Sequence, residues 1–313
     1  MKEVLIDLRA WRQFVAVAEE LHFGRAAQRL NMTQPPVTQA IAQLEKTLGV
    51  VLFDRTRRRV SLTPAGEALL PDVRELLARA QALPARARAA AAGQIGRVRI
   101  GFVSTVGFEK LPEWVREFRH LCPEVALELV EATGDVQLEA FSRGEIDAGL
   151  MLHSPGAAPA GLASLAVSEE PLALALPASH PLARTAGIDM AQVLAEPLVI
   201  FPRRIVPSLH DAIFDLYHAA GRVPVLAQEA IQMQTIVNLV SGGIGVAWVP
   251  ESVTQFRRAG VVYRTADEFA PTGRRRGAGV ALPRCETSLV WPAQAATPAL
   301  ERFIEFVRER QPL

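Results

Sequence analysis

Residues 24–66 constrain the fold more than any other part of this 313-residue chain. A helical pattern over residues 25–30 leads through a short turn into a second helix, which opens on residues 33–36, Thr-Gln-Pro-Pro. A run of arginines then lies between two apolar segments, residues 50–53 and 60–62, which predict a β-hairpin. Two helices joined by a tight turn and followed by a cationic hairpin are typical of a winged helix-turn-helix, in which one helix enters the major groove of DNA.

The second of these helices has the pattern of a recognition helix. Thr33 is predicted to cap its first turn, where Pro35 and Pro36 are tolerated because the first amides of a helix have no intrahelical partner. The inward face, defined by apolar spacings of three and four, consists of Val37, Ile41, Leu44 and Leu48. The outward face carries Gln34, Thr38, Gln39, Ala42 and Gln43. A glutamine amide can pair bidentately with adenine, and a threonine methyl can pack against thymine.

Two further helices flank this segment. An amphipathic pattern predicts one over residues 8–21, and Thr63 is the expected N-cap of another over residues 64–92. Large apolar residues are scarce toward the end of the latter helix, so we expect it to bury its apolar stripe against a partner chain. These patterns divide the region into a winged helix-turn-helix domain, residues 1–63, and a linker or dimerisation helix, residues 64–92.

From Gly96 onward strands and helices alternate. Strands over residues 98–103, 125–131 and 146–150, separated by helices, predict a parallel sheet. A second set of alternating elements starts near Leu162, and the chain returns with strands near residues 279–282 and 287–291 and a final helix over 298–310. We therefore expect a two-lobed α/β domain over residues 93–313, with a ligand cleft where strands end. Lobe 1 would comprise about residues 93–163 and 270–313, and lobe 2 about residues 164–269; the fold class is thus α plus α/β.

The charges are divided between these parts. Residues 1–92 contain 14 Lys and Arg against 9 Asp and Glu, a net charge of +5. Residues 93–313 contain 20 against 24, a net charge of −4, and the whole chain carries +1. A basic small part joined to an acidic large part fits a nucleic-acid module with a separate partner domain.

Several other classes are disfavoured. No apolar run is long enough to cross a membrane, and the N-terminus lacks the apolar core of a signal peptide, so a cytoplasmic protein is expected. Cys122 and Cys285 have no metal-ligand spacing and favour two buried thiols over a redox pair. The six histidines show no zinc pattern, and the glycine-rich run at residues 241–245 follows a helix and enters a strand, the reverse of a dinucleotide fingerprint. We predict no enzyme, no metal and no cofactor.

At this point the chain resembles a LysR-type transcriptional regulator over its full length. The resemblance rests on the winged helix-turn-helix segment, FGRAAQRLNMTQPPVTQAIAQLEKTLGVVLFDRTRRRVSLTPAG, and on shorter segments, IGFV, LPEWVREFRHLCPEV, GEIDAGL and GGIGVAWVP, that occur in the family's order. It implies a homodimer through the linker helix, assembled as a homotetramer, that binds double-stranded DNA. It also implies a periplasmic-binding-protein-like domain for a small, usually anionic, effector. RNA polymerase is a further candidate partner.

The resemblance places Gln34, Pro35, Thr38 and Gln39 at the family's base-contacting positions. Many members carry Arg where this chain has Gln39 and a cation near Gln43, so we expect the operator to depend less on arginine–guanine pairs. Phosphate contacts are expected from the arginine run beside the wing. The predicted DNA-binding residues are Arg25, Gln34, Pro35, Pro36, Thr38, Gln39, Gln43, Arg55, Arg57 and Arg58.

A second candidate site lies at strand ends of the α/β domain. Ser104, Thr105, Thr133 and Gly134 each follow a strand and precede a helix, where hydroxyls and free amides can hold an anion. Phe201, Pro202 and Arg203 end a strand of the other lobe, with Arg203 as a carboxylate partner. Gln232 and Val246, with Ile231, complete the predicted effector pocket. Its apolar content suggests an aromatic or other small hydrophobic carboxylate.

Two other functions stay open at the level of sequence. One is an architectural DNA-binding protein without a ligand, and the other is a cytoplasmic solute-binding clamshell whose N-terminal part serves only for oligomerisation.

Overall fold

The computed structural model describes residues 5–55, 59–108, 110–270 and 282–311. The chain forms two compact units, Met1–Arg88 and Ala89–Leu313. The first unit has one buried apolar core and the second has two, one for each lobe of an α/β domain. The predicted fold class, α plus α/β, is confirmed.

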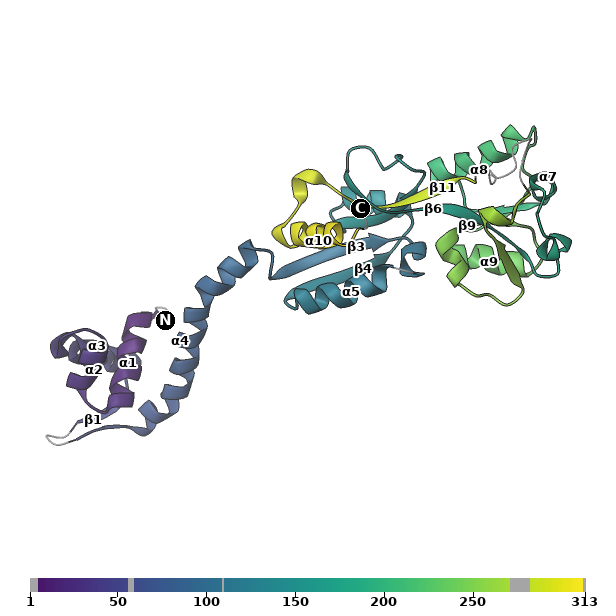
Figure 1. Ribbon diagram of the computed structural model, residues 1–313. Helices are drawn as coiled ribbons and strands as arrows, with labels where there is room; N and C mark the ends of the chain where they lie inside the picture. The colour runs from purple at the N-terminus through teal and green to yellow at the C-terminus, as the bar shows by residue number, and fades with distance from the viewer. Residues whose placement is uncertain (1–4, 56–58, 109, 271–281, 312–313) are drawn as a thin grey trace. The chain divides into compact units, whose positions relative to one another are not determined.

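The first unit is a winged helix-turn-helix (Figure 1). Its elements are α1 (Leu8–Glu20), α2 (Phe23–Arg29), α3 (Gln34–Leu48), β1 (Phe53–Arg55), β2 (Val60–Leu62) and α4 (Pro64–Ala91). β1 and β2 pair antiparallel, with Phe53 opposite Leu62. Phe53 packs its ring 5.5 Å from that of Phe14 on α1 and 6.0 Å from that of Phe23 on α2. One aromatic side chain at the base of the wing thus fixes the wing against two helices.

The start of α2 is set by a histidine cap. The Nδ1 atom of His22 accepts hydrogen bonds from the amides of Gly24 and Arg25, at 3.0 and 3.2 Å. α2 therefore begins at Phe23, two residues before the predicted start, because an imidazole replaces the more common hydroxyl or carboxylate cap.

The cap predicted for α3 differs in one respect. Thr33 occupies the N-cap position, but its hydroxyl accepts no capping hydrogen bond. An N-cap side chain bonds the amide of the second or third helical residue, and here these residues are Pro35 and Pro36, which have no N–H. The prolines, rather than a cap, define the start of the recognition helix through their fixed φ.

The cap predicted for α4 is confirmed. The hydroxyl of Thr63 accepts from the amide of Gly66 at 3.1 Å and donates to the carbonyl of Val51 at 2.7 Å. A Cβ atom at Gly66 would lie 2.4 Å from the carbonyl oxygen of Leu52, so only glycine allows this close approach. The first turn of α4 is thereby held against the segment that enters the wing.

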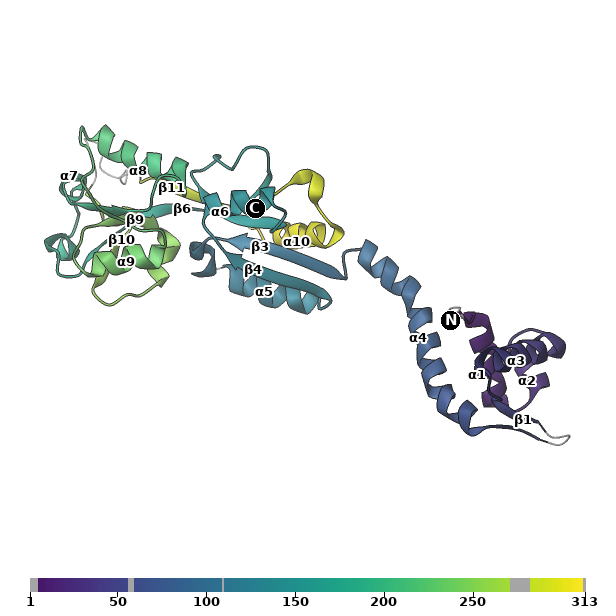
Figure 2. The same ribbon diagram turned by 180° about the vertical axis from the view of Figure 1, so that it is seen from behind.

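The second unit is a two-lobed α/β domain (Figures 1 and 2). Its elements through the middle of the chain are β3 (Gly96–Phe102), η1 (Ser104–Phe108), α5 (Lys110–Leu121), β4 (Val125–Glu131), α6 (Gly134–Ser142), β5 (Ala148–His153), β6 (Ala163–Pro177), η2 (Pro181–Arg184) and α7 (Met190–Val193). The remaining elements are β7 (Leu198–Ile200), α8 (Pro207–Ala219), β8 (Leu226–Glu229), α9 (Met233–Ser241), β9 (Ala247–Pro250), η3 (Glu251–Gln255), β10 (Val261–Arg264), η4 (Ala266–Glu268), β11 (Arg284–Trp291), η5 (Ala293–Ala295) and α10 (Pro298–Glu309).

The main sheet of this unit is mixed rather than parallel. Its strand order is β10-β6-β11-β5-β3-β4, and β9 also pairs with β6. β3 pairs parallel with β4 and β5, as predicted, whereas β11 pairs antiparallel with β5 and β6. The parallel prediction concerned only the strands over residues 98–103, 125–131 and 146–150, and it is confirmed for them. It did not cover β6 and β11.

β6 is the element that joins the lobes. Its first part pairs with β11, and its last six residues, from Leu172, pair with β9 and β10. β11 runs beside it into lobe 1, with a register shift between Thr287 and Ser288 (Figure 1). The ladder strands β3, β4 and β5 end toward the other lobe, whose parallel pair β7 and β8 forms a separate small sheet.

An ion pair fastens the loop before β5 to β3. Arg99 donates to Asp147 through Nη2 at 2.6 Å, through Nε at 3.2 Å and through its backbone amide at 2.8 Å. It also donates to the carbonyl of Gly144 at 2.6 Å. Burial raises the pKa of Asp147, but the hydrogen bonds from Arg99 outweigh burial and hold that pKa below its ordinary value of 3.8.

This pair predicts an acid-dependent stability of lobe 1. Because the folded pKa of Asp147 is depressed, its contribution is complete above pH 3.8 and is lost as the pH falls through the folded pKa. We expect Asp147→Asn to lower the free energy of unfolding at pH 7 by about 1–3 kcal/mol, measured by urea denaturation. The difference from the wild type should shrink below pH 3.8. The exposed Glu145→Gln is the control, and a difference that does not change with pH would contradict the prediction.

Candidate functional sites

The outward face of α3 is exposed in the first unit. Gln34, Gln39 and Gln43 are exposed, as are Pro35 and Pro36 at its start. The hydroxyl of half-buried Thr38 donates to the carbonyl of Gln34 at 3.1 Å, which leaves its methyl group for apolar contact. Its opposite face is buried through Val37, Ile41 and Leu44. Amide side chains thus line an accessible helix face, as the sequence predicts for a reader of base edges.

Glu45 joins this helix to the wing. Its Oε1 accepts from the amides of Leu52 and Phe53 at 2.9 and 3.1 Å, and its Oε2 accepts from Nη2 of Arg55 at 2.7 Å. The guanidinium of Arg55 also lies 4.9 Å from the ring centre of Phe23. Sequence reasoning treated Glu45 only as part of the helix and missed this contact, because its partners lie seven to ten residues away in another element.

Two of the predicted phosphate-binding arginines, Arg25 and Arg55, have partners within the protein. Arg55 pairs with Glu45, and Arg25 lies 3.4 Å from Glu20 and donates to its carbonyl at 2.5 Å. Arg25 is 60% exposed, so its pair with Glu20 can rearrange toward a phosphate. Arg57 and Arg58 lie outside the described residues, and their phosphate contacts stay a prediction.

A second charge cluster ties α1 to α2 and α4. Glu19 accepts from Arg29 at 2.7 Å and from Nε and Nη2 of Arg74 at 3.0 and 2.7 Å. Burial of Glu19 raises its pKa, but the two arginines outweigh burial and lower it, while Glu19 in turn raises the pKa of Arg29. These arginines therefore stabilise the module as well as making it cationic.

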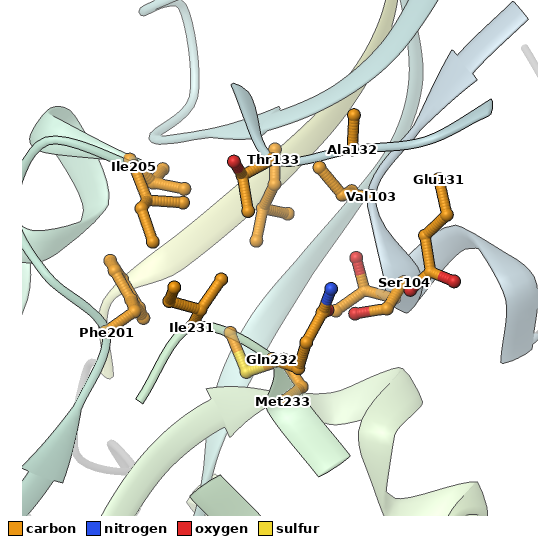
Figure 3. Close-up of a pocket in the computed structure, with 13 residues that line it drawn as sticks. Val103, Ser104, Glu131, Ala132, Thr133, Phe201, Ile205, Ile231, Gln232 and Met233 are labelled. Carbon is orange, nitrogen blue, oxygen red and sulfur yellow. The ribbon is translucent and has the colours of Figure 1, made fainter. Parts of the chain in front are cut away.

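The second unit contains a pocket between its two lobes (Figure 3). The cavity measures about 410 Å³, including the part that opens to solvent. Lobe 1 lines it with Val103, Ser104, Thr105, Glu131, Ala132, Thr133 and Leu152. Lobe 2 lines it with Phe201, Ile205, Val206, Ile231, Gln232 and Met233. Six of the predicted effector-pocket residues meet here: Ser104, Thr105, Thr133, Phe201, Ile231 and Gln232.

The other four predicted residues do not line this cavity. Arg203 is exposed, and Asp211 holds its guanidinium through two hydrogen bonds of 2.7 and 2.6 Å. Val246 is 1% exposed within the core of lobe 2, because its backbone bridges to Leu198. Pro202 is buried beside the pocket, and Gly134 lies behind it, where a Cβ atom would meet the carbonyl oxygen of Ile205 at 2.9 Å. Arg203 is thus paired with Asp211 and does not line the pocket, and its role as a carboxylate partner stays a prediction.

The polar groups of the pocket are neutral donors and one acid. Thr105 is 5% exposed, and its hydroxyl has no hydrogen-bond partner among the described residues. Gln232 is the N-cap of α9 without a side-chain capping bond, and the first turn of α9 contains no acidic residue. Its first amides are thus free to hold an anion. Sequence reasoning missed Glu131, the last residue of β4, which is the single charged residue of the lining.

The N-terminus of α6 differs from that of α9. Asp135 lies in the first turn of α6 and accepts from the hydroxyl of Thr133. Arg204 approaches Asp135 at 3.6 Å. The positive end of this helix already has a carboxylate, so α9 and Thr105 are the better anion donors.

The described ranges give little support for a metal site, a membrane-spanning helix or a reactive cysteine. No group of three or more His, Cys, Asp or Glu side chains there could hold a metal ion. No helix among these residues is long and apolar enough to cross a membrane. Cys122 and Cys285 are both buried and unpaired, and burial raises the pKa of the Cys285 thiol, as expected for an unreactive cysteine.

Comparison with known families gives two adjacent matches. Residues 8–67 match the family model described as a bacterial regulatory helix-turn-helix protein of the lysR family. Residues 91–312 match the LysR substrate binding domain. Together they span both units.

Individual relatives match over nearly the full length. The chain is 43% identical to the HTH-type transcriptional regulator IlvR of Caulobacter vibrioides over 305 residues, which is 97% of this chain and 98% of that protein. It is 41% identical to AlsR of Bacillus subtilis over 84% of this chain and 87% of that one. Among solved structures, full-length CbnR in complex with its target DNA superposes with a TM-score of 0.77 at 29% identity, covering 97% and 99% of the two chains.

The Glu45 contact predicts how the wing depends on α3. We expect Glu45→Ala to leave the amides of Leu52 and Phe53 without partners and so to raise their hydrogen exchange, at a stability cost of about 1–3 kcal/mol. Hydrogen–deuterium exchange of peptides covering residues 50–55 measures this directly. Peptides covering β5 in the other unit are the internal reference. Unchanged exchange over residues 50–55 would show that these amides are protected by other groups.

Proposed function

The chain belongs to the LysR family of bacterial transcriptional regulators, and from this premise we propose that α3 reads base edges while the interlobe pocket binds a small anionic effector. The observation that carries the proposal is the combination of an exposed, amide-rich recognition helix with a pocket that holds the buried Thr105 hydroxyl, which has no hydrogen-bond partner among the described residues. The relatives are transcriptional regulators, and one was solved on its target DNA.

The proposed reading mode relies on amides rather than cations. Gln34, Gln39 and Gln43 are exposed along one face of α3, and Thr38 lies between them with its hydroxyl bonded to the backbone. Each glutamine can donate and accept at once, as the N6 and N7 atoms of adenine require. Pro35 and Pro36 hold the first turn close to the groove, and arginines beside the wing supply sequence-independent attraction.

The proposed assembly is a dimer through α4. Of its 28 residues only Gly66 and Val73 are buried, while Leu76 and Leu83, one heptad apart, are 43% and 63% exposed. An apolar stripe of this kind is stable in water when a second copy covers it. Two copies present two recognition helices, which fits paired half-sites, and further pairing to a tetramer is part of the proposal. A regulator of this kind works in the cytoplasm, where the chromosome lies.

The proposed effector is a small carboxylate held at the junction of the lobes. The buried hydroxyl of Thr105 and the first amides of α9 supply uncharged donors from opposite lobes. A ligand that bridges them binds one arrangement of the lobes better than another and so shifts the population of that arrangement. DNase footprinting on the upstream DNA, with and without small carboxylates, tests the whole proposal.

Substitution of Gln39 tests the reading mode. We expect Gln39→Ala to reduce discrimination at one base step by about 1–3 kcal/mol, with affinity for random DNA retained. Selection from a randomised duplex library followed by competition binding measures the change. Gln28→Ala, which removes an equally exposed glutamine from α2, should select the same sequences as the wild type. Identical selected sequences for the Gln39 variant would reject its base contact.

Substitution of Thr105 tests the pocket. Thr105→Val preserves the shape of the side chain but removes its hydroxyl, so we expect about tenfold weaker binding of carboxylate probes and unchanged DNA affinity without ligand. Thr105→Ser, which retains the hydroxyl, should restore binding. Calorimetric titration with a panel that includes benzoate, 4-methyl-2-oxopentanoate and L-leucine gives the affinities. Equal affinities for the valine variant and the wild type would exclude Thr105 as a ligand donor.

A further inference from the structure

We propose that the effector is an α-amino acid with an apolar side chain, whose ammonium group pairs with Glu131 while its carboxylate occupies the Thr105 and α9 donors. This inference rests on the proposed function of the pocket and adds the class of its ligand. It follows from the arrangement of one acid, several neutral donors and an apolar wall around a single cavity.

The unpaired charge of Glu131 is the first observation. It is the single charged residue of the lining, and no hydrogen-bond or ion-pair partner for its carboxylate occurs in the parts of the chain that the structure describes. Asp135, four residues later, has both the Thr133 hydroxyl and Arg204. A carboxylate at a ligand cavity repels a second carboxylate and attracts a cation, so its natural complement is a positively charged ligand group.

The position of Glu131 relative to the anion donors is the second observation. Figure 3 shows the Glu131 carboxylate on the same side of the pocket as Ser104, with the Gln232 amide facing that side from the other lobe. Thr105 follows Ser104 and keeps a buried, unpartnered hydroxyl. The positive and negative groups of an α-amino acid sit on the same carbon atom, so they require complementary groups side by side, as this corner provides.

The apolar wall is the third observation. Phe201, Ile205 and Ile231 lie on the opposite side of the pocket from Glu131 and Ser104 (Figure 3). No charged or hydroxyl group occurs among the residues that lobe 2 contributes, and Gln232 is its single polar side chain. This wall can bury a branched aliphatic or aromatic side chain, whereas a second carboxylate there would lose its hydration without compensation.

Competing ligand classes fit less well. A dicarboxylate would place its second charge against either the apolar wall or Glu131. A 2-oxo acid of the same shape satisfies the donors and the wall but leaves Glu131 without a partner. An amine without a carboxylate satisfies Glu131 and leaves the Thr105 hydroxyl and the amides of α9 unused.

The experiment compares matched probes on the full-length protein. Isothermal titration calorimetry is carried out with L-leucine, with 4-methyl-2-oxopentanoate, in which an oxo group replaces the ammonium, and with 3-methylbutylamine, which lacks the carboxylate. L-phenylalanine and L-valine test how large a side chain the apolar wall accommodates. We expect L-amino acids to bind more tightly than the 2-oxo acid and the amine by about three- to tenfold.

The variant Glu131→Gln separates charge from shape. It should weaken the binding of L-leucine by a similar factor. The affinity for 4-methyl-2-oxopentanoate should stay the same or increase, because the repulsion between its carboxylate and that of Glu131 is removed. Glu128→Gln is the matched control, since Glu128 is an exposed residue of the same strand that lies 3.7 Å from Arg97 and does not line the pocket. It should behave as the wild type with every probe.

The outcomes distinguish the two proposals. If the 2-oxo acid binds as well as L-leucine and Glu131→Gln changes neither, the amino-acid inference is overturned while the carboxylate pocket stands. The amino-acid inference is also overturned, and the carboxylate pocket stands, if only benzoate or another carboxylate binds and Thr105→Val abolishes that binding. If no carboxylate binds at all, both the inference and the proposed effector fail, whereas DNA binding is judged separately by footprinting.

Discussion

The strands β6 and β11 are the constraint on which the α/β domain depends. β6 is long enough to pair with β11 in one lobe and with β9 and β10 in the other, so one continuous strand carries both lobes. The ladder hydrogen bonds make each lobe rigid, while the register shift beside Ser288 marks where pairing is interrupted. The pocket lies at this junction, and its two walls can change separation without breaking either core.

Sequence patterns were sufficient for local elements and insufficient for long-range pairing. Apolar periodicity identified α3, which buries Val37, Ile41 and Leu44 on one face. The alternation of strands with helices identified the strand at residues 125–131. The sequence predicts only residues 172–176, near the C-terminal end of β6, as a strand, since the first half of β6 is only partly buried and does not form an apolar run. The predictions for the pocket show the same difference between local patterns and long-range contacts. Ser104, Thr105, Thr133 and Arg203 were all predicted from strand ends. The carboxylate role of Arg203 was added from its charge, and its position beside Asp211 depends on the folding of α8. Glu131 could have been found, since it ends a strand two residues before Thr133.

Electrostatics in the winged unit serve two purposes at once. Glu19 pairs with Arg29 and Arg74, and Glu45 pairs with Arg55. Part of the positive charge of residues 1–92 therefore stabilises the fold through ion pairs. The outward face of α3 is nearly uncharged because its residues are mostly amides, and Lys46 near its end is the single cation of this helix. Attraction to DNA and discrimination among sequences are then assigned to different residues. In the proposed reading mode, long-range attraction comes from the arginines, and selection comes from amides whose contacts need correct geometry.

Polar and apolar groups of the pocket come from different lobes, so a ligand that contacts both kinds of group must contact both lobes. Hydroxyls and an acid come from lobe 1, and an apolar wall with the N-terminus of α9 comes from lobe 2. A ligand with a charged head and an apolar tail therefore gains its full contacts only when it touches both lobes. Such a ligand binds one arrangement of the lobes more tightly than the others and so increases the population of that arrangement. A ligand that binds all arrangements equally shifts none of them. A purely apolar or purely charged molecule of the same size would occupy one wall and leave the lobes independent. Under the proposed function, regulation through this pocket therefore requires an amphiphilic ligand, whatever sequence α3 reads.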